Sequence, residues 1–502
     1  MMTVITRPYK ITISKLVFGL NVLLFFAFAS LLSGCSTGYE NALETNRVAS
    51  IYPDYYDLTL PPNIAPLNFI INEPGSKFRI EISGKNGKPV VIQQHSATVE
   101  IPVKKWKKLL SENTGKNITV DIKAFEQNQW KHYKTIPHKV ATDTIDAFLV
   151  YRLVHATYLK WKDMGIYQRN LTNFDESPLI ENNSTENGCM NCHSFSANNP
   201  EKMVMHFRIV NAGTLVWNNG KLTKTDTKTE KTMSAGIYPA WHPDGRHIAF
   251  STGKISPHLT TRLGKPVDVA DKASGIIVMD TEKNTIVTSP EISTIRRESM
   301  PEWSADGKYL YFVSAPEAQK GDEESLLHNR YSLMRVACDI DNRVWGEAEM
   351  ILNADSIGKS ISMPAASPDG KFLVCSMSDY GYFTIFHKQS DLYLINLTDF
   401  SFKKLELNSE FTESHSSWSL NSRWLVFSSK RADGVFTRPY IAYIDENGTP
   451  GKPFVLPQKD PAFYQQFTVN YNRPDLVTGK VNLSPIQIRD VVLGEAEKAK
   501  AE

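Results

Sequence analysis

Hydrophobic and polar residues alternate in short runs between Tyr55 and about Val140. Alternation of this kind places apolar side chains on one face of an extended strand, and it occurs at 67–71, 78–82, 90–92 and 118–125. The dipeptide Asn86-Gly87 separates two of these runs, and Asn-Gly favours the tight turn of a β-hairpin. The pattern predicts a small β-sandwich, immunoglobulin-like or fibronectin-like, over residues 55–140.

The segment 141–187 is predicted to connect this domain to the rest of the chain. Within it, residues 147–161 have the period of an amphipathic helix but are rich in Tyr, Val and Leu. Both helix and strand therefore remain open for this stretch.

A repeated strand–turn–strand pattern occupies the body of the chain, which is predicted to extend over 188–485. Its four clearest copies lie at 238–250, 300–312, 363–375 and 415–427. Each copy carries Asp-Gly, or Asn421-Ser422 in the fourth, where a tight turn needs positive φ. Trp241, Trp303 and Trp418 occupy matching positions, where a large ring can pack between neighbouring sheets.

The copies begin 62, 63 and 52 residues apart, which leaves room for four strands in each unit. Four-stranded sheets arranged around an axis form a β-propeller. A fifth copy is predicted at 191–207, with Cys192-His193 in the place of Trp241-His242. A sixth unit is predicted from 463–478 together with strands that precede Cys189.

These hairpins, of the form W-S-P-D-G-K, resemble those of the TolB-like propeller family. The resemblance covers about 300 residues and implies an all-β fold, with a six-bladed propeller after the N-terminal sandwich. It implies little about function, because such propellers serve as binding scaffolds, enzyme lids and partner platforms.

One segment of the repeat region carries a chemical motif, Cys189-Met190-Asn191-Cys192-His193. This C-x-x-C-H pattern is the attachment motif of c-type haem. The thiols of Cys189 and Cys192 can each form a thioether with a haem vinyl group, and His193 then binds the iron. A Cys189–Cys192 disulfide is the main alternative. Zinc would need two further ligands, which the sequence does not offer at suitable spacing.

Residues 191–195 also resemble haem-attachment segments of cytochromes c, and are similar to segments of TolB-like envelope lipoproteins of the Bacteroidetes type. For the sixth iron ligand, Met205 is favoured, with Met203 and His206 as alternatives. The two methionines are equally well explained as core residues of a strand. A ligand from another loop, or an open site, also remains possible.

The remaining histidines and cysteines give weaker signals. Four histidines of the propeller region are expected to be structural or solvated: His242, His247, His258 and His415. Cys338 and Cys375 belong to adjacent repeats and are expected either to bridge or to be small buried side chains.

The N-terminus has the features of a lipoprotein signal peptide. Arg7, Lys10 and Lys15 precede an apolar run over 16–32, which ends at Leu32-Ser33-Gly34-Cys35. Small residues before a cysteine predict cleavage there and acylation of Cys35. Residues 36–54 are then expected to form a flexible tether, and 486–502 a charged, solvated tail. Ser36 favours the outer membrane over retention at the inner one, by resemblance to the usual sorting pattern.

The composition and the absence of known motifs argue against two kinds of function, nucleic-acid binding and catalysis. Lys and Arg number 56 against 54 Asp and Glu, which gives no electrostatic reason to expect nucleic acid as a partner. The sequence contains no nucleophile elbow, phosphate-binding loop or zinc-protease motif, so no catalytic motif supports an enzymatic function.

The expected function is that of a lipid-anchored protein with covalent haem c, active in electron transfer or redox sensing. It is expected on the periplasmic side of the outer membrane, with the cell surface also possible, and its expected partners are other envelope proteins. The alternative is a non-redox scaffold that binds proteins or glycans and contains a Cys189–Cys192 disulfide.

Overall fold

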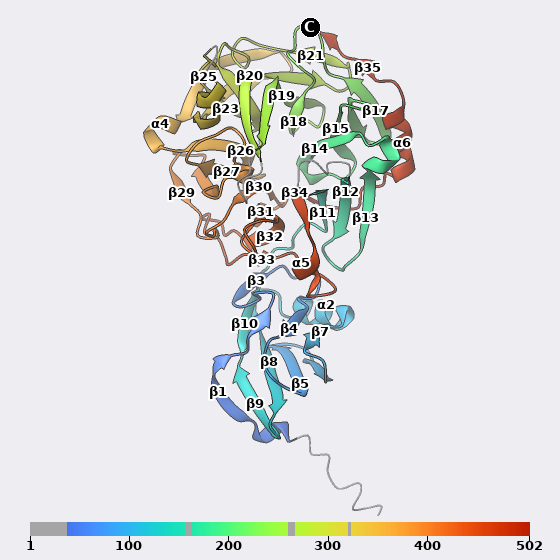
Figure 1. Cartoon of the computed structure of the whole chain (residues 1–502), viewed down its shortest axis with the longest axis vertical. Helices are drawn as coiled ribbons and strands as arrows, with labels where there is room; N and C mark the ends of the chain where they lie inside the picture. Colours follow the sequence, from blue (N-terminus) through green and yellow to red (C-terminus); the bar gives the residue numbers. More distant parts are fainter. Residues whose placement is uncertain (1–37, 156–162, 260–266, 320–322) are drawn as a thin grey trace, which may run out of the picture.

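The computed structural model describes residues 38–155, 163–259, 267–319 and 323–502. The chain forms a small N-terminal β-domain and a larger ring of β-sheets, arranged end to end (Figure 1). No helix within these ranges has the length and apolar content needed to cross a membrane.

The N-terminal domain is a β-sandwich of a seven-stranded and a three-stranded sheet. The larger sheet consists of β1 (Leu43–Val48), β3 (Leu58–Leu60), β5 (Lys77–Gly84), β6 (Val90–Gln94), β8 (Asn117–Glu126), β9 (Gln129–Lys134) and β10 (Ile136–Val140). The smaller sheet consists of β2 (Ile51–Tyr52), β4 (Phe69–Ile71) and β7 (Thr98–Val99). β5 and β6 pair in antiparallel fashion around Asn86-Gly87, which confirms the predicted hairpin.

Helix α2 (Val103–Glu112) is an addition to the expected sandwich. It buries Trp106, Leu109 and Leu110 in the core that the two sheets share. The Trp106 indole donates to the Ile64 carbonyl at 3.0 Å, so this buried nitrogen keeps a hydrogen bond.

The ring contains six sheets within the described residues, four of them with four strands and two with a fifth strand at the outer edge, which makes it a six-bladed propeller. Blade 1 is built from β34 (Val469–Val477), β11 (Phe148–His155), β12 (Gly165–Asn170) and β13 (Glu176–Glu181). Blade 2 is built from β14 (Cys189–Phe195), β15 (Lys202–Arg208), β16 (Gly213–Asn218) and β17 (Lys221–Asp226). Blade 3 is built from β18 (Ile237–Trp241), β19 (His247–Leu259), β20 (Val267–Asp280) and β21 (Thr285–Val287).

The other three blades follow in chain order. Blade 4 contains β22 (Arg297–Trp303), β23 (Tyr309–Ala315), β24 (Ser332–Asp339) and β25 (Val344–Leu352). Blade 5 contains β26 (Ser360–Ala366), β27 (Phe372–Ser378), β28 (Asp391–Asn396) and β29 (Phe402–Lys404). Blade 6 contains β30 (Glu413–Trp418), β31 (Trp424–Ser429), β32 (Arg438–Tyr443) and β33 (Phe454–Val455).

Short helices occupy several connections between these strands. They are η1 (Tyr39–Asn41), η3 (Asn182–Thr185), η4 (Ser196–Asn198), α3 (Glu323–His328), α4 (Ala354–Ile357), η5 (Thr384–Phe386) and α5 (Phe463–Gln466).

The ring is closed by pairing between distant parts of the chain. β34, near the C-terminus, pairs with β11 and becomes the innermost strand of blade 1, as the sixth predicted unit requires. The innermost strands β34, β14, β18, β22, β26 and β30 contact one another in sequence around the ring. Residues 148–155 are therefore strand, which decides between the two alternatives for the described part of 147–161.

Every innermost strand contains a β-bulge at the same place. In five blades the bulge residue has positive φ, as at Tyr238 and His415. In β14 the extra residue is Cys192, because Asn191 pairs with His206 and His193 with Met205. Cys192-His193 therefore occupies the place of Tyr238-Pro239. The predicted alignment of Cys192-His193 with Trp241-His242 is therefore wrong by three residues. The counterpart of Trp241 is Phe195, because Phe195 pairs with Met203 as Trp241 pairs with Ile248.

The repeated tryptophans join neighbouring blades. Trp241 donates to the Ser194 carbonyl at 3.3 Å, and Trp418 donates to the Ala365 carbonyl at 3.1 Å. In both cases a side chain of one innermost strand reaches the backbone of the preceding one. The rings are largely buried, so they contribute apolar contact area as well as this hydrogen bond.

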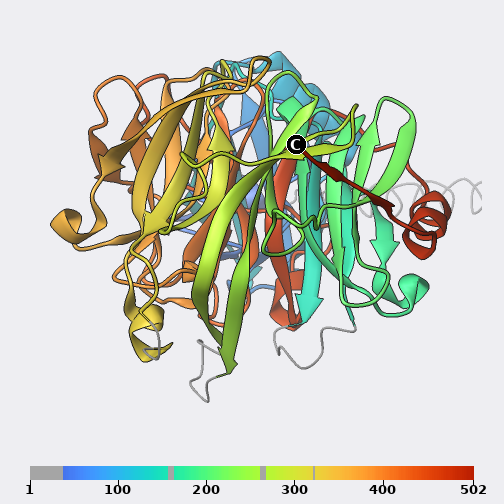
Figure 2. The ribbon, with the colours of Figure 1, turned by 90° about the horizontal axis from the view of Figure 1, so that it is seen from above.

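Three predicted boundaries are wrong. The predicted tether over 36–54 already contains β1 and β2, and the predicted connector over 141–187 contains β11–β13. The predicted tail over 486–502 contains most of α6 (Pro485–Leu493), together with β35 (Glu497–Lys498) and β36 (Lys500–Ala501). β35 and β36 extend blades 2 and 3 at their outer edges, and the C-terminal segment lies across the outside of the ring (Figure 2). Edge strands pair through backbone groups, so their sequences need no apolar period.

Two truncations test the role of the closing strand. Removing residues 495–502 deletes two edge strands of two residues each, and we expect the free energy of unfolding to fall by about 2 kcal/mol. Removing residues 469–502 deletes β34 and leaves an inner edge of β11 unpaired, so we expect no cooperative unfolding transition. Thermal unfolding followed by circular dichroism distinguishes these results. A cooperative transition near the full-length temperature in the longer truncation would contradict this account.

Candidate functional site

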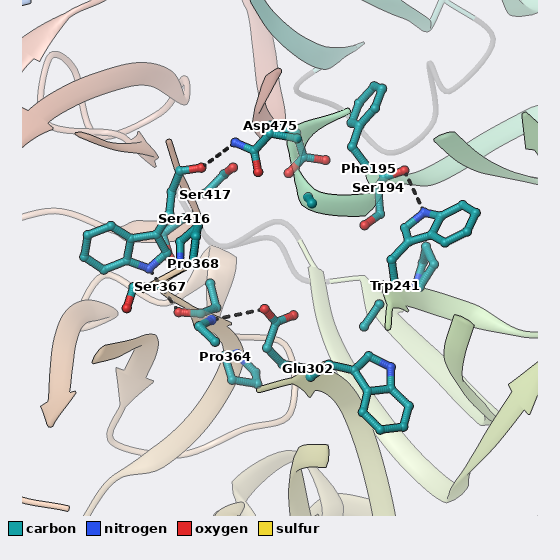
Figure 3. Close-up of a pocket in the computed structure, with 18 of the residues that line it drawn as sticks. Ser194, Phe195, Trp241, Glu302, Pro364, Ser367, Pro368, Ser416, Ser417 and Asp475 are labelled. Carbon is teal, nitrogen blue, oxygen red and sulfur yellow. Dashed lines mark hydrogen bonds between the residues drawn. The ribbon is translucent and has the colours of Figure 1, made fainter. Parts of the chain in front are cut away.

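The channel of the propeller opens into a cavity lined by the same short segment of every innermost strand. The cavity has a volume of about 330 Å³. The third and fourth residues of each segment line it, the segments being 192–195, 238–241, 300–303, 363–366, 415–418 and 473–476. Figure 3 shows these side chains converging from all sides of the ring.

Glu302 and Asp475 are the two acidic residues that line this cavity. Glu302 accepts a hydrogen bond from the Ala366 backbone at 3.1 Å, and burial raises its pKa to about 7. Burial also raises the pKa of Asp475 to about 6, although Arg473 opposes the shift. The Arg473 Nε lies 3.9 Å from Asp475 Oδ2, whereas Glu302 forms no ion pair within the described residues.

The C-x-x-C-H motif lies on β14, the innermost strand of blade 2. Cys189 is buried, Cys192 is half-buried, and both thiols are free. His193 is 1% exposed. The three predicted attachment residues are thus brought together on one strand beside the channel.

Two arginines lie beside the thiols. Arg208 on β15 approaches the Cys189 sulfur at 3.8 Å, and Arg152 on β11 donates to the Met190 carbonyl and the Asn191 side chain at 2.9 and 2.8 Å. Both thiols interact electrostatically with both guanidinium groups. No carboxylate of the described residues pairs with either arginine, so the cysteines have a positively charged environment, which the sequence pattern did not indicate.

The imidazole of His193 has an unused nitrogen. Its Nε2 is buried without a hydrogen-bond partner, and it lies 3.5 Å from Asp475 Oδ2 on β34. Burial lowers the pKa of His193 to about 3, so the ring is neutral at physiological pH. A neutral imidazole nitrogen with a free electron pair is a suitable metal ligand.

The three sequence-based candidates for the sixth iron ligand lie on β15 and do not line the cavity. Met203 and Met205 are fully buried in the apolar core shared by blades 1 and 2. His206 is buried, and its Nδ1 is hydrogen-bonded to Thr214 at 3.1 Å. The two methionines are therefore core residues of a strand, which was the other explanation that the sequence offered for them.

The remaining cysteines take no part in this site. Cys338 and Cys375 are free and belong to different hydrophobic clusters, so they do not bridge. Burial raises the pKa of Cys338 to about 12, as expected for an unreactive thiol. Cys35, the predicted lipidation site, lies outside the described residues.

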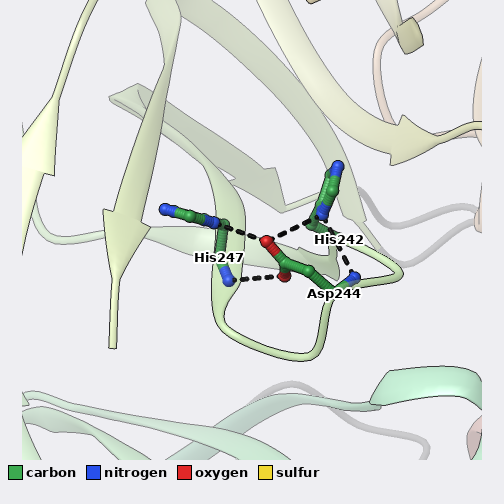
Figure 4. Close-up of side chains that lie close together, drawn as sticks. All are labelled: His242, Asp244 and His247. Carbon is green, nitrogen blue, oxygen red and sulfur yellow. Dashed lines mark hydrogen bonds and ion pairs between the residues drawn. The ribbon is translucent and has the colours of Figure 1, made fainter. Parts of the chain in front are cut away.

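His242, Asp244 and His247 form a compact cluster in the first turn of blade 3 (Figure 4). His242 occupies the place of Ser304, Ser367 and Ser419 in the other blades. Its Nδ1 accepts from the Asp244 backbone at 3.2 Å, and its Nε2 is hydrogen-bonded to the Gly307 carbonyl at 3.1 Å. His247 Nδ1 is 2.7 Å from Asp244 Oδ2. Both imidazoles are thus used in holding the turn, which agrees with the structural role expected for them.

The raised pKa of Glu302 predicts a pH-dependent stability. The folded chain holds a proton that the unfolded chain releases above its ordinary pKa of about 4.5, so stability falls as pH rises from there to about 7. Glu302→Gln keeps an acceptor for the Ala366 N–H but removes the ionisation. We expect the variant to exceed the native chain in stability by about 2 kcal/mol at about pH 8, with little difference at about pH 4.

Urea unfolding at the two pH values measures this difference. Glu347→Gln, which changes an exposed residue of β25, serves as the matched control and is expected to follow the native chain. Equal effects of the two substitutions at the higher pH would contradict the assignment of a half-buried carboxyl group without an ion pair at position 302.

The chain matches no family model and no curated protein. Among solved structures, it is similar to a hypothetical selenium-binding protein from Sulfolobus tokodaii, with 9% identity over 84% of this chain and 98% of that chain, at a TM-score of 0.41. It is also similar to the Cps50 (Swd1) β-propeller domain of Myceliophteria thermophila, with 10% identity over 62% and 87% of the two chains, at a TM-score of 0.34. These similarities concern the fold alone. The order of its own sheets makes this chain a β-propeller.

Proposed function

We propose that this protein is a lipid-anchored, TolB-like propeller of the periplasm that binds a c-type haem covalently and acts in electron transfer or redox sensing. One observation carries the proposal. A single strand, β14, carries two free thiols and a buried imidazole nitrogen with no hydrogen-bond partner. Two cysteines three positions apart and a following histidine form the donor set of c-type haem.

The residues of β14 fit this group by the chemistry of their donor atoms. The S–H of Cys189 and that of Cys192 would each add across one vinyl C=C bond, the sulfur bonding to one carbon and the hydrogen to the other. This addition needs no oxidant and leaves two thioethers. His193 Nε2 would bind the iron, and the bound haem supplies one-electron redox chemistry. Asp475, 3.5 Å from Nε2, must give way when iron is bound.

The predicted lipid anchor supports the same proposal. Haem c is attached outside the cytoplasmic membrane, and a lipobox at Cys35 directs a chain to that compartment. The acylated Cys35 would hold the protein at the periplasmic side of the outer membrane or at the cell surface. A redox partner would then be another envelope protein that docks on the propeller.

Expression in a host competent for cytochrome c maturation tests the attachment. We expect red protein whose pigment stays with the chain through acid-acetone extraction. Cys189→Ala and Cys192→Ala should each leave one thioether and shift the pyridine haemochrome band, and the double variant should lose all covalent pigment. His193→Ala should change the Soret spectrum, because the ring would no longer bind iron.

Cys338→Ser is the matched control, since it removes another cysteine that is not fully buried and lies far from β14 in the fold. It is expected to keep the native spectrum. Colourless protein with an intact Cys189–Cys192 disulfide, from a host that matures a control cytochrome, would refute the proposal.

A second candidate function, partner or glycan binding, is favoured by the cavity itself. Its wall combines Glu302 and Asp475 with aromatic rings such as Trp241 and Trp418, and polar groups beside aromatic surfaces are typical of ligand sites. Under this alternative Cys189 and Cys192 form a disulfide and the protein has no redox role. Mass spectrometry of the purified chain separates the two, since a haem adds its mass whereas a disulfide removes two hydrogens.

A further inference from the structure

The bulge of each innermost strand places one residue at the same height, and these six residues form a ring. They are Cys192, Tyr238, Met300, Met363, His415 and Arg473. All except Cys192 line the cavity and have positive φ, which non-glycine residues adopt uncommonly. Because the same strained backbone conformation recurs at this place in the ring, the side chains at these positions leave their strands in a fixed direction. We name this set the bulge ring.

Most members of the bulge ring are occupied by other interactions. The Met300 sulfur accepts from the Met363 backbone at 3.3 Å. Tyr238 is hydrogen-bonded to Tyr382 through its hydroxyl, and Arg473 donates to the Pro239 carbonyl at 3.3 Å. Cys192 is assigned to the thioether. His415 and Met363 are left as possible iron ligands.

His415 has the more suitable donor atom. Its Nε2 is buried and has no hydrogen-bond partner, like Nε2 of His193. A buried polar atom without a partner is costly and calls for an explanation, such as a ligand that the site normally holds.

The two imidazoles lie on either side of β34 in the ring. His193 lies on β14 and His415 on β30, the two innermost strands that flank β34. Their neighbours Ser194 and Ser416 face each other across the cavity, with Asp475 near the edge between them (Figure 3). The two rings are also close enough to interact electrostatically. Axial ligands must approach an iron from opposite sides, which two residues on one hairpin, such as His193 and Met205, do not do.

We propose that His415 supplies the second axial ligand of the iron, so that the haem is held by two histidines. This inference rests on the proposed function, because it needs haem attached to Cys189 and Cys192. It replaces Met205, and it predicts a lower reduction potential than methionine ligation would give, since a methionine ligand raises the potential of cytochromes c.

The test uses the full-length chain with haem attached, and attachment is checked in every variant by the haemochrome spectrum. We expect low-spin electron paramagnetic resonance of the native protein with the signature of two imidazole ligands. His415→Ala should give a high-spin spectrum that added imidazole returns to low spin. His415→Met should introduce the methionine–iron charge-transfer band and shift the potential upward.

Met205→Leu is the matched control and should keep the native spectrum, since Met205 belongs to the core. Three results would overturn the inference while leaving the haem proposal intact: a high-spin native protein, a methionine–iron signature in the native protein, or an unchanged spectrum in His415→Ala. Native protein without covalent haem would instead refute the proposed function itself. If His415→Ala does not fold, the resonance spectrum of the native chain still decides between two histidines and the other ligand sets.

Discussion

The antiparallel pairing of β34 with β11 is the interaction on which the whole propeller depends. These strands are separated by more than 300 residues, and their hydrogen bonds turn an open arc of sheets into a ring. Closure covers the inner edge of β11 and brings blade 1 into contact with blades 2 and 6. The same strand carries Arg473 and Asp475 into the channel, so the seam of the ring and its charged site are one structure.

Repetition of the bulge gives this scaffold its functional variety. Each innermost strand places one bulge residue at the same height of the ring, whatever its chemistry, because the backbone register is set by the sheet and not by that side chain. A thiol, a phenol, two thioethers, an imidazole and a guanidinium thus lie in one ring. The six blades thus carry different chemistry on the same backbone, which illustrates why a propeller repeat tells so little about function.

Much of the fold could be predicted from local sequence signals. Asp306-Gly307 and its counterparts mark turns because only certain residues adopt positive φ, and the tryptophans mark contacts between blades. The alignment of the Cys192 copy failed because its turn is longer and lacks Asp-Gly, so the sequence shows no landmark for the register. β1 and β35 were missed because they pair through backbone groups at sheet edges and carry few apolar side chains.

Only part of the candidate site could be predicted from the sequence. Cys189, Cys192 and His193 are adjacent in the chain, and their spacing carries the chemical signal. Arg152, Arg208 and His415 come to the site from other strands, through pairings that no local pattern reveals. Met203 and Met205 show the reverse difficulty, since closeness in sequence suggested a role that burial between blades 1 and 2 does not support.

The late position of β34 in the chain has a consequence for the order of assembly. Cys189 is buried in the closed ring, and β14 is flanked there by β34. During synthesis, blade 2 emerges long before the strand that completes blade 1, and until then this flank of β14 has no neighbour. Under the proposed function, a haem would reach the thiols most easily in that interval, so attachment would precede closure and β34 would then cover the completed site.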